Sequence, residues 1–211
     1  MNITSTLTRY ASILLAIVCI GASPSANAVP NKYATSSDFK LPAAPSPSAR
    51  PSAKLPNLGR DKHGMPFYHP KQLNRVVRTT AYTHTESDHV GYGPKNAIST
   101  YLVYNDDVRS AAADWSVYPL GTKFKIKGQP YTYIVDDYGS ALVGTGTIDI
   151  YQPTKGLMRK WGRRIVEISV IEWGSSQQSM KQLAARTRFK HCKEMQTALK
   201  TQEKHSQTAQ H

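Results

Sequence analysis

Short runs in which apolar and polar residues alternate occupy the middle of the chain. They are rich in β-branched and aromatic residues, which favour strands over helices. These runs cover residues 76–84, 100–104, 123–127, 131–135, 147–151 and 164–173. Residues 153–162 have instead the pattern of a short helix, with a proline near the first turn and a glycine at the end. Six short strands and one small helix predict a mainly all-β domain that closes into a compact barrel.

The residues on either side of this domain have other patterns. Residues 1–28 combine Arg9, an apolar run over 11–22 and the small residues of 26–28, which predicts a secretory signal peptide and an exported protein. An uncleaved membrane anchor and lipidation of Cys19 are the alternatives. Once the signal is removed, Cys192 is the only cysteine, so we expect no intramolecular disulfide.

Two further segments complete the predicted organisation. Residues 29–75 are rich in Pro, Ser and Lys with few large apolar residues, so we expect a disordered linker. The barrel domain is expected over residues 76–174. Residues 175–211 form a basic tail whose apolar spacing is partly helical. A solvated or frayed helix is the favoured interpretation of this tail, and an amphipathic surface helix is the alternative.

The charge distribution changes the first impression of a basic protein. The chain has 27 Lys and Arg against 14 Asp and Glu, a formal charge of +13, which is typical of nucleic-acid binders. However, residues 76–174 hold eleven basic and ten acidic residues, so the excess lies in the flanks. We therefore expect no nucleic-acid partner and instead an attraction of the flanks to anionic envelope polymers.

Three aspartates in the predicted barrel are candidates for chemistry. Asp137 follows a strand and opens a glycine-containing turn, Asp149 interrupts an apolar strand, and Asp114 precedes a turn. A carboxyl group buried in such a strand keeps its proton to higher pH. Cleavage of a glycosidic bond needs a carboxyl group of this kind, held in a cleft and paired with a second one. Structural roles in caps and turns are the alternative.

Four motifs occur in an order that resembles a known family. They cover Ala113 to Thr122, Asp137 to Gly144, 148–151 and 161–166. The resemblance is to the 3D domain, named for its three aspartates, which is also the catalytic half of membrane-bound lytic transglycosylase A and is related to rare lipoprotein A. It implies a six-stranded double-psi β-barrel over about residues 77–174. Ser140 and Val143 stand where the family has Gly and Lys.

The resemblance also implies an activity, the lytic cleavage of peptidoglycan glycan strands between N-acetylmuramic acid and N-acetylglucosamine. Asp137 would act first as acid and then as base, yielding a 1,6-anhydro product, and Asp149 and Asp114 would be flanking carboxylates. Asp136 is less favoured because it faces the other side of its strand. The residues expected to bind substrate are Tyr82, Thr83, Gly139, Ser140 and Ala141. A glycan-binding module without activity and a hydrolytic muramidase are the alternatives, and the two substitutions favour the first of these.

Two other kinds of site are weighed against this interpretation. His84, Glu86 and Asp88 would share one face of a strand and could bind zinc or calcium, but the segment is more simply a solvated loop. Gly139, Gly144 and Gly146 lack the Gly-Lys-Ser/Thr ending of a phosphate loop. We therefore expect no metal, nucleotide or other cofactor.

Overall fold

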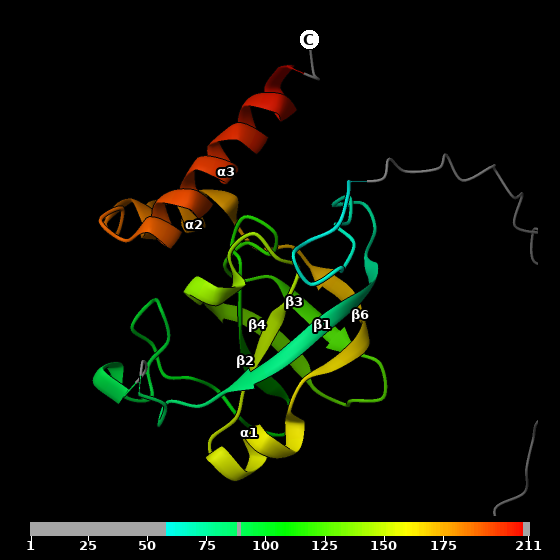
Figure 1. Cartoon of the computed structure of the whole chain (residues 1–211), viewed down its shortest axis with the longest axis vertical. Coiled ribbons are helices and arrows are strands. Elements are labelled where there is room, and N and C mark those ends of the chain that lie inside the picture. The colour runs from blue at the N-terminus through cyan, green and yellow to red at the C-terminus, as the bar shows by residue number, and fades with distance from the viewer. Residues whose placement is uncertain (1–57, 88–89, 209–211) are drawn as a thin grey trace, which may run out of the picture. The chain divides into compact units, whose positions relative to one another are not determined.

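The structure is a computed structural model that describes residues 58–87 and 90–208. The predicted signal peptide and most of the predicted linker lie outside the described residues. Six strands form a closed barrel in the order β1-β5-β2-β4-β3-β6 (Figure 1). The pairs β1·β5 and β2·β4 are parallel, and the other pairs are antiparallel. The strands are β1 Asn74–Tyr82, β2 Val108–Ala113, β3 Lys123–Ile126, β4 Thr132–Asp137, β5 Ile148–Tyr151 and β6 Arg164–Glu172. The predicted fold class, a mainly β protein built on a six-stranded barrel, is confirmed.

Alternation along the strands fills the barrel with apolar side chains. Ile148 and Ile150 on β5 are fully buried, and the residue between them points the other way. Phe124 on β3 stacks against Tyr133 on β4, with ring centroids 5.3 Å apart. The loop 127–131 joins these two antiparallel strands, as its Gly-Gln-Pro sequence predicts.

One of the six predicted strands is wrong, and one strand was missed. Residues 100–104 make only isolated bridges, at Tyr101 and Tyr104, and Tyr101 is 70% exposed. The missing strand is β2, whose serine and alanines are weak strand formers. β2 lies between β4 and β5 with nearly every residue buried, so packing on both sides decides its conformation.

The predicted short helix is α1, Lys155–Trp161. The Thr154 side chain caps it by accepting a hydrogen bond from the Leu157 N–H at 3.2 Å. Gly162 ends it with a positive φ of 61°, which glycine adopts without steric cost. Two single turns of 3-10 helix, η1 Val90–Tyr92 and η2 Ser140–Leu142, lie in the loops.

The C-terminal residues fold against the barrel, so the prediction of a solvated or frayed tail is wrong. They form α2, Ser176–Ala184, and α3, Lys190–Thr208, at the end of the barrel opposite α1 (Figure 1). Leu183 of α2 and Met195 and Leu199 of α3 are almost completely buried and join the barrel core. These apolar side chains pack against one end of the barrel. The sequence of the tail does not indicate that a barrel end is close to it. Among the described residues, no helix has the length and apolar character needed to cross a membrane.

The end of the predicted linker is also part of the fold. Residues 58–75 pack on the barrel, and the reason is visible at Asp61 and Arg75. Asp61 is buried and accepts hydrogen bonds from the backbone N–H groups of Met65 at 2.9 Å and Gly146 at 3.1 Å. The buried Arg75 guanidinium lies over the Trp173 ring, 4.8 Å from its centroid. These two polar contacts help to hold a segment whose composition predicts disorder.

Candidate active site

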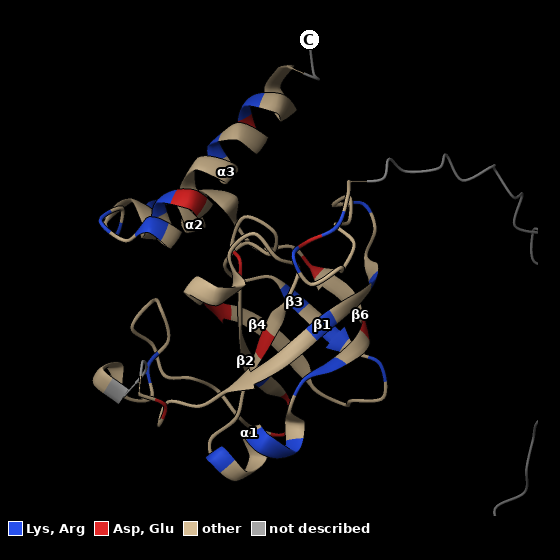
Figure 2. Ribbon diagram, viewed as in Figure 1, with Lys and Arg blue, Asp and Glu red and all other residues tan. Residues whose placement is uncertain are grey.

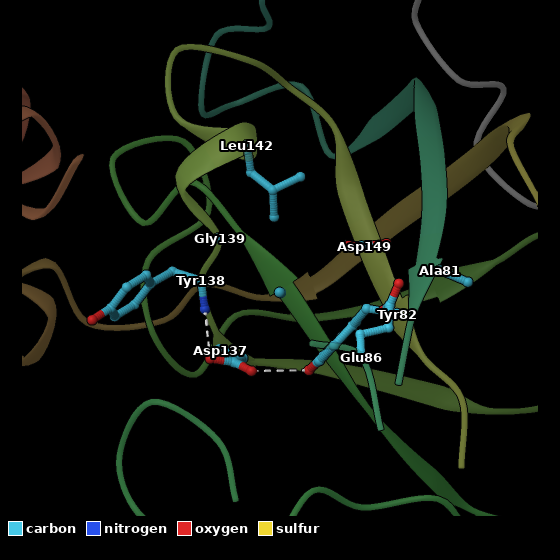
Figure 3. Close-up of a pocket in the computed structure, with 9 residues that line it drawn as sticks. Ala81, Tyr82, Glu86, Asp137, Tyr138, Gly139, Leu142 and Asp149 are labelled. Carbon is cyan, nitrogen blue, oxygen red and sulfur yellow. Dashed lines mark hydrogen bonds between the residues drawn. The ribbon is translucent and has the colours of Figure 1, made fainter. Parts of the chain in front are cut away.

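A small pocket lies where the C-terminal end of β4 meets β1 and β5. Its volume is about 200 Å³, and three of its lining residues carry carboxyl groups. These are Glu86, Asp137 and Asp149. Figure 3 shows Asp137 at the centre of this arrangement, with Tyr82 and the backbone of Tyr138 directed toward it.

Asp137 is placed by a bulge at the end of β4. The β2–β4 register runs from Ala111 opposite Val135 to Ala112 opposite Asp137, so Asp136 is the extra residue. Asp137 is 6% exposed and accepts two hydrogen bonds, from the Tyr82 hydroxyl at 3.1 Å and from the Tyr138 N–H at 2.9 Å (Figure 3). Its carboxyl group is therefore held in one orientation toward the pocket.

Asp149 enters the same pocket from β5 because its neighbours Ile148 and Ile150 point into the core. Burial raises the pKa of Asp149 to about 6. The negative charges of Glu86 and Asp137 add to the rise, while a hydrogen bond from the Thr80 hydroxyl at 2.7 Å and the charge of Arg78 oppose it. A proton is thus available inside the pocket within about one pH unit of neutrality.

Tyr82, predicted from the sequence as a substrate-binding residue, lines the pocket and also donates a hydrogen bond to Asp137. Burial raises the pKa of the Tyr82 hydroxyl well above its ordinary value, and the nearby charges of Asp137, Asp136 and Asp149 raise it further. Tyr82 therefore stays protonated and donates to Asp137 across the pH range of a folded protein.

The other two aspartates do not reach this pocket. Asp114 accepts hydrogen bonds from the Ser116 N–H at 2.8 Å and the Gly144 N–H at 2.7 Å, so it holds the loop after β4 in place. Asp136 accepts hydrogen bonds from Ser110 at 2.6 Å and Asn96 at 2.9 Å on the other side of β4, as its alternation predicts. Burial raises the pKa of both carboxyl groups, and these hydrogen bonds oppose the rise.

An open groove of about 450 Å³ adjoins the pocket and shares Asp137, Tyr138 and Gly139 with it. Ser140 lines the groove, and Gly139 lines both spaces. Thr83 is fully buried, and its N–H donates to the Glu86 carboxylate at 3.0 Å. Ala141 is exposed on the loop and accepts a hydrogen bond from Lys62 at 3.3 Å. Thr83 and Ala141 line neither space.

The sequence analysis missed several residues that line these spaces. Glu86 was considered only as a metal ligand, although a carboxylate three residues beyond the Tyr82 segment could have suggested a pocket residue. The groove wall formed by Arg186, Arg188, Phe189 and His191 lies outside the predicted domain. This wall could not be predicted from the sequence, because the pattern of the tail does not indicate which part of the barrel the tail covers.

Two side chains of the metal site considered from the sequence have other partners. His84 Nδ1 lies 2.7 Å from the Tyr151 hydroxyl, and Glu86 accepts the Thr83 N–H. Asp88 lies outside the described residues. Within residues 58–87 and 90–208, no group of three or more His, Cys, Asp or Glu side chains is arranged to hold a metal ion.

Comparison with known proteins bears on the barrel. Residues 109–172 match the sequence model of the 3D domain. This match runs from β2 to β6 and holds Asp114, Asp137 and Asp149, whereas β1 with Tyr82 and the helices α2 and α3 lie outside it.

The chain is similar to YabE from Bacillus subtilis (strain 168), which is named as a putative cell wall shaping protein. The two sequences are 34% identical over 96 residues. The match covers 46% of this chain and 22% of YabE, so the chain spans about a fifth of that relative's length. The likeness is therefore to one part of YabE.

Proposed function

We propose that this protein is an exported lytic transglycosylase that cleaves the glycan strands of peptidoglycan. The observation that carries the proposal is the placement of Asp137 and Asp149 in one pocket, with Asp137 also lining the adjoining open groove. A polymer can lie in the open groove while the reacting bond reaches the buried carboxyl groups. The 3D domain and the likeness to part of YabE support the choice of peptidoglycan as substrate.

In the proposed reaction the carboxyl pair begins with one proton. Asp137 gives this proton to the glycosidic oxygen, and the bond from that oxygen to C1 of the muramyl residue breaks. Asp137, now a carboxylate, takes the proton of the muramyl C6 hydroxyl, and the C6 oxygen bonds to C1 to form the 1,6-anhydro ring. No water is consumed. The Tyr82 hydroxyl keeps Asp137 oriented in both steps.

Asp149 has a supporting role in this proposal. Burial, with smaller contributions from the charges of Glu86 and Asp137, raises the pKa of its carboxyl group to about 6, so the pocket disfavours the charged form. Asp149 therefore holds a proton in a growing share of the molecules as the pH falls toward 6. When the glycosidic bond breaks, the ionised pair stabilises the positive charge that develops at C1.

Digestion of purified sacculi, followed by mass spectrometry of the products, tests the proposal. Anhydro-muropeptides are expected from the wild type. Asp137→Asn should lower the rate by about 100-fold to 10,000-fold, the usual contribution of a positioned acid or base, whereas the exposed control Asp107→Asn should leave it unchanged. Products with reducing ends would identify a hydrolase. Intact glycan that sediments with the protein would identify a binding module.

A further inference from the structure

The open groove beside the pocket has one wall that comes from the C-terminal helices. The loop between α2 and α3 and the first turn of α3 supply Arg186, Arg188, Phe189 and His191 to its lining. The opposite side is formed by the 92–99 loop, and Asp137 to Ser140 lie between. None of the four wall residues lies within the matched 3D domain, which ends at residue 172.

This wall is basic and aromatic. Residues 185–191 include three basic residues and no acidic one, and Figure 2 shows Lys and Arg gathered on this loop. Phe189 stacks on His191, and His191 lies against Tyr138, each with ring centroids 5.7 Å apart. A row of rings therefore leads from the outer wall to the residue beside Asp137.

One guanidinium in the wall has unused donor capacity. Among the described residues, Arg186 Nη1 is buried and has no hydrogen-bond partner. Leaving a buried charged donor without an acceptor is costly, so such a group indicates a ligand. The exposed Arg188 lies on the same wall, with its guanidinium 4.8 Å from the centroid of the Phe189 ring. In the groove lining, the acidic residue is Asp137.

The wall is held rigidly in place. Cys192 and Met195, which follow the loop, are completely buried in the barrel core. The Met195 sulfur accepts a hydrogen bond from the Trp115 N–H at 3.4 Å, and on α2 the Ser179 hydroxyl accepts one from the Leu120 N–H at 2.9 Å. The backbone that carries the two arginines is therefore anchored to the barrel, which lowers the cost of ordering the wall when a ligand binds.

We propose that Arg186 and Arg188 bind carboxylates carried by the muramyl residue of the glycan, while Phe189 and His191 offer ring surfaces to the sugar. This inference rests on the proposed function, and it specifies which part of the substrate occupies the groove. The glycan backbone of sugar and acetamido groups is uncharged. The carboxylates of peptidoglycan lie on the peptide, or on the lactyl group of a muramyl residue from which the peptide has been removed. Arginine matches this chemistry because its planar donors pair with carboxylates.

The test measures binding of soluble probes to the full chain carrying Asp137→Asn, so that cleavage does not interfere. The probes are a muramyl tetrasaccharide with its peptides, the same tetrasaccharide after an amidase has left the free lactyl carboxylate, and uncharged chitotetraose. The variants Arg186→Gln and Arg188→Gln are compared with Arg159→Gln, an equal charge change on α1 away from the groove. Arg188 is exposed, so its replacement leaves the packing intact even if that of Arg186 does not.

Each groove variant should weaken binding of a carboxylate-bearing probe by about tenfold, the effect of one lost charge-assisted hydrogen bond. Binding of chitotetraose should change less than twofold, and Arg159→Gln should bind every probe as the parent does. Loss with the amidase-treated probe alone assigns the contact to the free lactyl carboxylate, and loss with the peptide-bearing probe alone assigns it to a carboxylate of the peptide. Loss with both probes shows that the two arginines accept either carboxylate. Equal losses for chitotetraose, or unchanged binding of both muramyl probes, would overturn the inference. If selective loss occurs but wild-type protein releases no anhydro product, the proposed function fails while the binding assignment stands.

Discussion

Replacing Asp149 by asparagine should make the protein more stable at neutral pH. Asp149 interrupts an apolar strand, and burial together with the charges of Glu86 and Asp137 raises the pKa of its carboxyl group to about 6. Asparagine has nearly the same shape, can still accept the hydrogen bond from Thr80, and has no charge. The variant therefore removes an electrostatic cost with little change in packing.

The size of the effect follows from the pKa. The ordinary value is 3.8 and the folded value is about 6, a difference of about two units, each equivalent to about 1.4 kcal/mol. Because Asp149 is partly exposed, solvent reduces the resulting figure of about 3 kcal/mol, and we expect about 1–3 kcal/mol at pH 7–8. Between about pH 4 and pH 6 the folded state binds more protons than the unfolded state, so wild-type stability rises as pH falls through this range. The Asn variant lacks this contribution, and its advantage should vanish near pH 4.

Urea unfolding at several pH values between about 4 and 8 measures this difference, with tryptophan fluorescence, to which the buried Trp115 contributes, as the signal. Asp107→Asn, which removes an exposed carboxylate, is the control and should change stability little at any pH. The same Asp149→Asn protein should cleave sacculi poorly, since the pocket loses a proton-holding group. If the Asn variant is no more stable than wild type at pH 8, or if its advantage does not depend on pH, the burial argument is wrong.

Three further changes test the packing around the site. Gly174→Ala should lower the unfolding free energy by about 3 kcal/mol, because the added Cβ would overlap the backbone between residues 119 and 122. Gly156→Ala is the control in the same denaturation experiment. Its new Cβ meets only a threonine hydroxyl at 3.8 Å, so this variant should lose little stability. Asp114→Ala should lower the melting temperature, with a loss of about 1–3 kcal/mol for a loop N–H left without its acceptor, and an unchanged melting temperature would contradict its loop-holding role. Burial alone would raise the pKa of Asp61, but hydrogen bonds from backbone N–H groups outweigh burial and lower it. The stability from this carboxylate is therefore present above its unfolded pKa of about 4 and is lost as pH falls through the folded value, so Asp61→Asn should be less stable at pH 7 and should show a smaller loss in acid titrations followed by circular dichroism.

Local patterns were sufficient for much of the barrel. β-branched and aromatic alternation located five of its strands, and the proline and glycine at the ends of 153–162 located α1. Asp137 was a candidate because it lies at a strand end before a glycine turn, but this pattern also fits an ordinary turn residue. Its catalytic role was expected only from the resemblance to the 3D domain. These features depend on neighbours within a few residues, and such short-range preferences are written directly in the sequence.

The remaining features depend on contacts between distant residues. β2 is a strand because β4 and β5 enclose it, although its own residues are weak strand formers. Asp114 and Asp149 were both expected to be carboxylates flanking Asp137. In the structure Asp114 accepts a hydrogen bond from the Gly144 N–H in the loop after β4, and only Asp149 lines the pocket.

The sequence by itself therefore determined the β-barrel, its short helix and the aspartates that could carry chemistry, because propensity and alternation act locally. Only the tertiary structure decided which carboxyl groups share a pocket and that a basic C-terminal loop forms a wall of the groove beside it. The physical reason is that closing the barrel and burying Leu183, Met195 and Leu199 bring together segments far apart in the chain. The closure of the barrel therefore decides which charged groups and hydrogen-bond partners each aspartate meets.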